Sequence, residues 1–187
     1  IAGNSTNDTT GCLDGDGDGW SDTADSFPDE ASQWEDADGD GYGDNSNGTE
    51  PDACPSVFGI SDQNSTYGCP DSDADGWSDG QDAFPSETSQ WADADGDGYG
   101  DESNGVNADD CPAESGTSDQ ESVLGCPDTD GDGWANSIDD LPEEETQQSD
   151  MDGDGFGDDP TGFQPDSCLN VFGNSSNDRF GCPDQDG

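Results

Sequence analysis

The apolar residues of this chain follow neither the period of a helix nor that of a strand. No segment of helical length places them at i, i+3, i+4 and i+7, and no run of five residues alternates apolar with polar positions. Proline and glycine interrupt the chain every few residues. The pattern predicts an irregular fold with little regular secondary structure, in which single helical turns over 21–27 and 143–148 are the only regular elements expected.

The apolar residues that do occur recur at one constant interval, the interval that separates Cys12 from Cys69. The cysteines form two series at this repeat interval, Cys12, Cys69, Cys126, Cys182 and Cys54, Cys111, Cys168, and only the last step of the first series is shorter, by one residue. We therefore expect three repeats, over 12–68, 69–125 and 126–181, with the end of a repeat at 1–11 and the start of another at 182–187. Repeats that contact only their neighbours build an elongated array. Both ends fall inside a repeat, so we expect the chain to continue, covalently or by association with copies of itself, into a linear polymer.

The composition indicates that this chain is either disordered or folded by something positive and external, and the cysteines and the regular Asp-Gly patterns favour the second. Its 187 residues include 49 Asp and Glu against one basic residue, Arg179, and the formal net charge is −48. Leu, Ile, Val and Phe together make up only about a tenth of the chain, and a highly charged chain so poor in these residues is expected to be disordered. The charge excludes nucleic acid and argues against anionic membranes, because no cationic surface can displace counterions from phosphates. No apolar stretch approaches the ~20 residues that span a bilayer.

We expect no enzymatic activity. The chain has no His and its one basic residue is an arginine, so a nucleophile has no imidazole or lysine to activate it. A glycosidase needs two carboxylates with different pKa values in a cleft, and this chain has too few apolar residues to build one.

The acidic residues concentrate in two loops per repeat, which in the first repeat begin at Asp14 and Asp36. The first loop has acids at positions 1, 3, 5 and 12, glycine at 6, tryptophan at 7 and Asp or Asn at 9: Asp14, Asp16, Asp18, Trp20, Asp22, Asp25; Asp71, Asp73, Asp75, Trp77, Asp79, Asp82; and Asp128, Asp130, Asp132, Trp134, Asn136, Asp139. The second loop has the same pattern up to position 9, with Tyr or Phe at 7: Asp36, Asp38, Asp40, Tyr42, Asp44; Asp93, Asp95, Asp97, Tyr99, Asp101; and Asp150, Asp152, Asp154, Phe156, Asp158.

This spacing is typical of a calcium loop. Carboxylates at positions 1, 3 and 5 point inward from a tightly curled backbone, glycine at 6 allows the turn, and positions 7, 9 and 12 complete the ligands. An all-oxygen site in a flexible loop suits Ca²⁺ better than Mg²⁺. We expect at least six calcium sites, and Asp184 and Asp186 would begin a seventh loop.

The residue that closes the second loop stays open between two sets. The candidates are Asn47, Asn104 and Thr161 at position 12, or Asp52, Asp109 and Asp166, each two residues before a cysteine.

The cysteines favour local disulfides. Each cysteine of the second series is followed, after a short and nearly constant separation, by one of the first series, and this favours Cys54–Cys69, Cys111–Cys126 and Cys168–Cys182, which leaves Cys12 over. A bond from Cys12 to Cys54 stays an alternative, and metal ligation by cysteine is the least favoured interpretation. Several cysteines in a chain with so small a core are typical of extracellular domains.

Two further groups recur in the repeat. The tryptophans at position 7 could be platforms for sugar, but we expect them to form small hydrophobic centres, packed on Phe27, Phe84 and Leu141. Glycosylation sequons occur at Asn4, Asn7, Asn64 and Asn174, between the cysteines. Chance occurrence in Asn/Ser/Thr-rich sequence is an equal alternative for them.

The runs CPDSDADGWSDGQD from Cys69 and DADGDGYGDESNG from Asp93 resemble the thrombospondin type 3 repeat, as does DACP from Asp52. Cys-Pro before Asp71 leaves no room for the entering helix of an EF-hand. The resemblance implies a calcium-filled, disulfide-bonded, extracellular string that acts as a stalk or adhesive region. The length of the repeat, with an insert between its two loops, departs from that family.

From these patterns we expect an extracellular or cell-surface structural protein that calcium rigidifies into a stalk, fibre or filament. The alternatives are an adhesion module that binds sugar or protein and a calcium reservoir without defined shape. Recurrence of almost every residue favours the first, because binding sites usually break the symmetry of an array.

Overall fold

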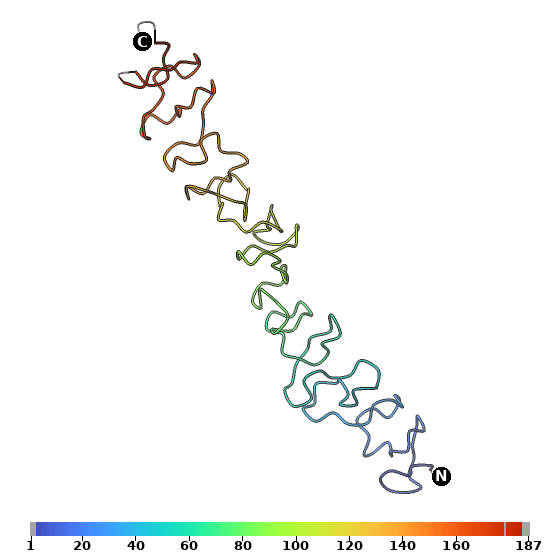
Figure 1. The fold of residues 1–187 in the computed structure, drawn as a ribbon. Coiled ribbons are helices and arrows are strands. Elements are labelled where there is room, and N and C mark those ends of the chain that lie inside the picture. The colour runs from blue at the N-terminus through green and yellow to red at the C-terminus, as the bar shows by residue number, and fades with distance from the viewer. Residues whose placement is uncertain (1–2, 178, 185–187) are drawn as a thin grey trace. The chain divides into compact units, whose positions relative to one another are not determined.

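The computed structural model describes residues 3–177 and 179–184. The described backbone forms bends and turns but no helix and no strand, and its only β-type pairing is three isolated bridges, Gly43–Pro51, Asp52–Tyr67 and Gly100–Ala108 (Figure 1). The irregular fold expected from the sequence is therefore confirmed. Two compact units make up the chain, Ile1–Trp91 and Ala92–Gly187, and the boundary falls between the two acidic loops of the second repeat.

The expected one-turn helices are reduced to turns. The Asp25 N–H donates to the carbonyl of Ser21 at 3.0 Å, but the next N–H, of Ser26, donates across the chain to Trp34. Over 143–148 the Gln147 N–H donates to Glu144 at 2.9 Å, in a turn of the shorter, three-residue spacing. The first turn does not propagate, because the Ser26 N–H is bonded elsewhere and Pro28 has no N–H to donate.

The interior of the described chain is polar. Its buried apolar residues are Cys69, Cys126, Cys182 and Ala135, and the largest side chains that are almost fully buried are Gln33, Gln90 and Gln147. The tryptophans at position 7, expected as hydrophobic centres, are only half-buried. The most deeply buried residues are hydrogen-bonded polar side chains and disulfide cysteines rather than aromatic rings.

Where a ring contact of a position-7 tryptophan is described, its partner is another tryptophan and not the expected Phe or Leu. The ring of Trp77 stacks on Trp91, with centroids 6.1 Å apart and an interplanar angle of 11°. In the first repeat Trp20 and Trp34 line one cavity, while Phe27 lines another with Tyr42. The aromatic residue at position 7 therefore has a ring contact in each kind of loop, Trp77 with Trp91 in a first loop and Tyr42 with Tyr67 in a second loop.

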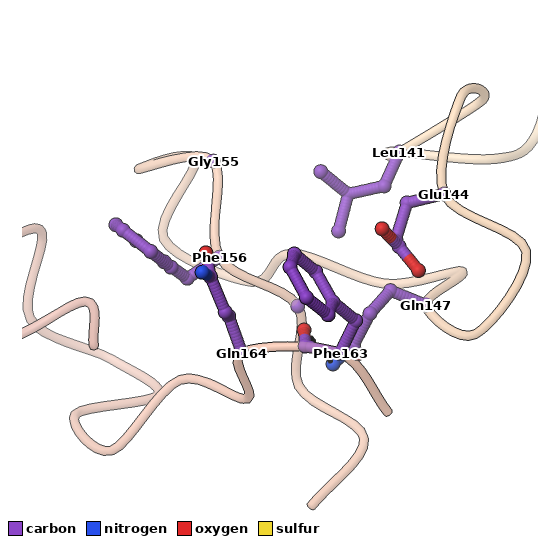
Figure 2. A pocket seen from close by; sticks show the side chains of 8 residues that line it. Leu141, Glu144, Gln147, Gly155, Phe156, Phe163 and Gln164 are labelled. Carbon is purple, nitrogen blue, oxygen red and sulfur yellow. Dashed lines mark hydrogen bonds between the residues drawn. The ribbon is translucent and has the colours of Figure 1, made fainter. Parts of the chain in front are cut away.

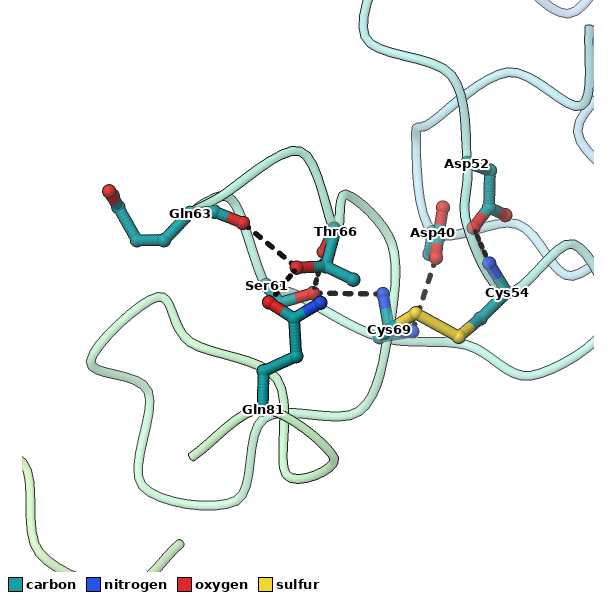
Figure 3. The surroundings of a disulfide bond; sticks show 9 residues. Asp40, Asp52, Cys54, Ser61, Gln63, Thr66, Cys69 and Gln81 are labelled. Carbon is teal, nitrogen blue, oxygen red and sulfur yellow. Dashed lines mark hydrogen bonds between the residues drawn. A yellow bond between two sulfur atoms is a disulfide. The ribbon is translucent and has the colours of Figure 1, made fainter. Parts of the chain in front are cut away.

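Three disulfides join Cys54–Cys69, Cys111–Cys126 and Cys168–Cys182, the local pairs that the short separations favoured. Cys12 is the free cysteine, and it is half-buried. Beside each of the first two disulfides lies a buried serine, Ser61 or Ser118, whose hydroxyl accepts the N–H of the second cysteine at 3.0 and 2.9 Å. The Ser61 hydroxyl also donates to the carbonyl of Thr66, as Figure 3 shows. The segment between the cysteines is therefore closed by side chains as well as by sulfur.

Candidate metal centres

The acids at positions 1, 3 and 5 come together in space. In each group three carboxylate oxygens, one per residue, lie within 4.8 Å of one another; these groups include Asp14, Asp16, Asp18; Asp36, Asp38, Asp40; Asp71, Asp73, Asp75; Asp93, Asp95, Asp97; and Asp128, Asp130, Asp132. Such triplets could hold metal ions, since like charges this close repel one another unless a cation lies between them.

Backbone N–H groups hold these acids in place. In the loop that starts at Asp71, the Asp71 carboxylate accepts the N–H of Ala74 at 2.7 Å and of Gly76 at 2.9 Å. Asp73 and Asp75 each accept the N–H two residues ahead, at 3.2 and 2.8 Å. Gly76 has φ 102°, a conformation that glycine adopts without steric cost. The sequence thus curls the backbone around its own carboxylates.

Several acids at positions 3 and 5 bond to the backbone through one oxygen at most and leave another without a partner. Among the buried side-chain oxygens that accept no hydrogen bond are those of Asp73 and Asp75 in a first loop and of Asp95 in a second loop. The same condition holds in the other repeats for Asp16, Asp18, Asp130, Asp132, Asp38 and Asp152. A buried carboxylate oxygen without a donor is costly, so the loops fit a cation that supplies the missing partner.

The acid at position 12 turns toward the first loop. Asp82 and Asp139 are 9 and 8% exposed. Burial raises the pKa of Asp139, and the carboxylates of Asp132 and Asp130 raise it further. Burial likewise raises the pKa of Asp82 and of Asp25, with contributions from the acids of their own loops. In all three repeats the position-12 acid therefore lies close enough to the carboxylates of positions 1 to 5 for their negative charge to raise its pKa.

The second loop has an exposed residue at position 12 and a buried acid five residues later. Asn47, Asn104 and Thr161 are exposed, whereas Asp52, Asp109 and Asp166 are 6, 7 and 8% exposed and each keeps a buried oxygen without a hydrogen bond. Burial raises the pKa of Asp52, and Asp40 and Asp38 raise it further. The same causes act on the pKa of Asp109, beside Asp97 and Asp95.

A short backbone pairing returns this acid to the second loop. The Asp52 N–H donates to the carbonyl of Gly43 at 2.9 Å, and Asp109 and Asp166 make the same bond to Gly100 and Gly157 at 2.8 Å. Figure 3 shows Asp40 and Asp52 beside the Cys54–Cys69 disulfide. A carboxylate from beyond the loop's first twelve positions therefore lies beside the loop.

Positions 7 and 9 differ in the hydrogen bonds that they make. The residue at position 9 bonds back to the start of its loop: Asp22 accepts the Gly15 N–H at 2.7 Å, and Asn136 accepts the Thr129 N–H at 2.9 Å. Asp44 and Asp158 keep a buried oxygen without a hydrogen bond. Among the described residues, the carbonyls at position 7 accept no backbone N–H, and these residues are Trp20, Tyr42, Trp77, Tyr99, Trp134 and Phe156.

The remaining candidates lie outside these six loops. Asp184 is exposed and its N–H donates to Asn174 at 3.4 Å, while Asp186 lies outside the described residues. The sequon residues are exposed, and they are Asn4, Asn7, Asn64 and Asn174. Asn64 donates from Nδ2 to Gln81 at 2.9 Å.

Three buried glutamines were missed in the sequence, although Gln33, Gln90 and Gln147 recur at the repeat interval. Their recurrence is the one sequence signal that points to a structural role. An isolated polar residue between two loops nevertheless suggests an exposed side chain, and nothing in the sequence indicates which groups its amide contacts.

No protein-family model matches the chain, and a search of curated proteins finds no match. The described part of the chain contains no helix long and apolar enough to cross a bilayer. Its repeated acid triplets, three disulfides and nearly absent secondary structure are compatible with a metal-binding repeat protein. The disulfides indicate an oxidising, non-cytoplasmic environment.

Proposed function

We propose that this chain is an extracellular structural repeat protein that calcium ions fold and rigidify. The observation that carries the proposal is the set of buried carboxylate oxygens without hydrogen-bond partners, which recurs in all six acidic loops. Such oxygens destabilise a metal-free fold and stabilise a metal-bound one, because the ion replaces the water that they lose on burial.

The donor set supports calcium over other cations. Each second loop offers five carboxylates, at positions 1, 3, 5 and 9 and at Asp52, Asp109 or Asp166, and the first loop offers four or five with position 12. Hard carboxylate and carbonyl oxygens select Ca²⁺ or Mg²⁺, and an irregular loop meets the variable geometry of Ca²⁺ more readily. Zinc is disfavoured because the chain has no His and six of its seven cysteines are in disulfides.

The interior supports a structural role for these ions. With four buried apolar residues in the described chain, little hydrophobic area opposes the entropy of ordering the backbone. The free energy of binding six ions then becomes folding free energy. A reservoir without defined shape would not need the turns, buried serines and buried glutamines that recur from repeat to repeat.

Metal removal tests this proposal. We expect native mass spectrometry to count at least six calcium ions per chain, and small-angle X-ray scattering to show a larger radius of gyration after chelation. Loops of this kind in extracellular modules bind at about 10⁻⁴ to 10⁻³ M. Unchanged dimensions with and without chelator would refute calcium-dependent folding, and fewer than six ions bound at saturating calcium would refute the six-site scheme.

The near-exact recurrence of loops and disulfides also supports a linear array, made of further repeats of one chain or of associated copies, as a stalk, fibre or filament. Imaging of native material together with denaturing electrophoresis in chelator and reductant tests it. Fibres that yield chains of 19.3 kDa indicate association, longer chains indicate one polypeptide, and compact monomers in millimolar calcium contradict both.

We propose N-linked glycans at Asn4, Asn64 and Asn174, which the surface position of these side chains supports. An intact mass of native protein equal to the polypeptide plus metal would contradict this.

A further inference from the structure

We propose that Gln33 and Gln147 are positioning residues, which hold the closing carboxylate of their own second loops against its ion. The inference rests on the proposed calcium function. These glutamines are among the largest almost fully buried side chains in the described structure, at 2 and 1% exposed. A buried primary amide is stabilising only when its donors and acceptor are bonded, so its partners show what it holds together.

Each amide whose bonds are described ties together the segment that leads from position 9 to the closing acid. Gln147 Nε2 donates to the carbonyls of Asp159 and Phe163, at 3.1 and 3.2 Å, and its Oε1 accepts the Asp159 N–H at 2.9 Å. Gln33 repeats the arrangement with Asn45 and Thr49: its Nε2 donates to their carbonyls at 3.2 and 3.0 Å, and its Oε1 accepts the Asn45 N–H at 3.0 Å. One side chain therefore fixes both ends of a five-residue excursion.

Gln147 also contacts Gly157, the residue whose carbonyl accepts the N–H of the closing acid Asp166. A Cβ built on Gly157 would lie 2.2 Å from Oε1 of Gln147, and one on Gly162 would lie 2.5 Å from Nε2. The carbonyl of Gly157 in turn accepts the N–H of Asp166. Figure 2 shows Gln147 in the cavity that it lines with Gly155, Phe156 and Phe163. Gln147, Gly157 and Asp166 thus form a chain of direct contacts.

The difference between the two loops explains why only the second has such a glutamine. The first loop closes at position 12, and the N–H of its closing acid Asp139 donates to Ala135 within one turn, at 3.0 Å. The second loop closes five residues later, through a segment whose position-12 residue is exposed. Extra residues add conformational freedom to a loop, so a fixed tie lowers the entropy cost of bringing Asp166 to the ion.

The substitution Gln147→Met tests the role, with Gln148→Met as a control at the next residue. The readout is a calcium titration followed by NMR at the glycine amides of position 6, one per loop. Gly155 donates to Asp150 at 2.7 Å and Gly133 donates to Asp128 at 3.0 Å, so each amide reports the ion in its own loop. We expect Gln147→Met to raise the calcium Kd at Gly155 about tenfold and to leave Gly133 unchanged, and Gln148→Met to change neither.

A second pair of variants covers the case in which methionine is simply tolerated or disrupts the fold. Gly157→Ala should displace the Gln147 side chain and weaken calcium binding at Gly155 but not at Gly133. In a chain that already carries Gln147→Ala, adding Gly157→Ala should raise the calcium Kd at Gly155 by a smaller factor than it does in the wild-type chain. The positioning role would be overturned if Gln147→Met left calcium binding at Gly155 unchanged, or if it weakened calcium binding equally at Gly133 and Gly155. It would also be overturned if the effects of Gly157→Ala and Gln147→Ala on the Kd at Gly155 were fully additive. If neither glycine of the wild-type chain responds to calcium, the proposed calcium function fails as well, which distinguishes the two failures.

Discussion

Removal of the Cys54–Cys69 disulfide should weaken calcium binding in the adjoining second loop. The disulfide segment contacts that loop at two places. The Gly59 N–H donates to the Asp40 carboxylate at 3.1 Å, and the Cys54 N–H donates to the Asp52 carboxylate at 2.6 Å (Figure 3). Both acids belong to the proposed ligand set, so the disulfide orders two ligands of one ion.

The size of the effect follows from the length of the closed segment. The two cysteines are 15 residues apart, and a loop of that length is stabilised by about 3 kcal/mol in the entropic model. If the loop and the disulfide segment order together, this free energy is drawn from calcium binding once the bond is absent. At ~1.4 kcal/mol per factor of ten, the Kd of the second loop should rise by up to roughly a hundredfold.

The variant with Cys54→Ser and Cys69→Ser measures this effect, and Cys12→Ser is the control because Cys12 is the free cysteine. In a calcium titration by NMR the Gly41 amide reports the adjoining second loop, and Gly19 reports the first loop of the same repeat. We expect a large rise in Kd at Gly41, little change at Gly19, and no change in the control. An unchanged Kd at Gly41 would refute the coupling, and an equal rise at both glycines would show general loss of the fold instead.

Three further predictions concern single residues. Asp109→Asn should weaken calcium binding in its second loop at least tenfold while Asn104→Ala leaves it unchanged, as measured by the same amide titration; the reverse order would assign closure to position 12. In the calcium-free chain, burial and neighbouring acids raise the pKa of Asp109 and Asp82 above the ordinary 3.8. Their protonated forms therefore favour the compact state, which should be most populated below pH ~3.8 and be lost as the pH rises through the raised pKa values; scattering of the metal-free chain that shows expansion on acidification instead would contradict this. Ala74 has φ 65° where the other first loops have glycine, so Ala74→Gly should strengthen calcium binding by about 1 kcal/mol, or several-fold; weaker binding by calorimetry would show that the alanine is unstrained.

The acidic loops could be predicted from the sequence because their chemistry is local. Asp71, Asp73 and Asp75 bond to N–H groups no more than five residues ahead, so spacing alone determines which groups meet. The disulfides were equally local, since their partners are close in the sequence. The absence of helices in the described chain followed from the missing apolar period and from frequent proline and glycine.

The interior could not be predicted in the same way, because it depends on contacts between segments. The sequence suggested aromatic centres, since a tryptophan recurs at position 7 of each first loop. In the structure Trp77 instead stacks on Trp91, from the insert between the two loops. No periodicity in the sequence assigns such a partner, because each ring contacts a residue of another loop or turn.

The closing residue of the second loop shows where local reasoning ends. From the sequence, Asn104 and Asp109 were both candidates, since Asn104 lies at position 12 of the loop and Asp109 supplies a negatively charged carboxylate. The structure gives them different surroundings, which favour Asp109 in the proposed site: Asn104 is exposed, whereas the Asp109 N–H bonds to Gly100 and its carboxylate is buried beside Asp97. A closing carboxylate that lies five residues beyond position 12 can reach the ion only if the intervening segment is fixed. In our proposal the buried glutamine fixes that segment. A repeat with fixed spacing inside each loop can therefore be identified from its acids, whereas the residue that sets the loop's final geometry is found only through the contacts it makes.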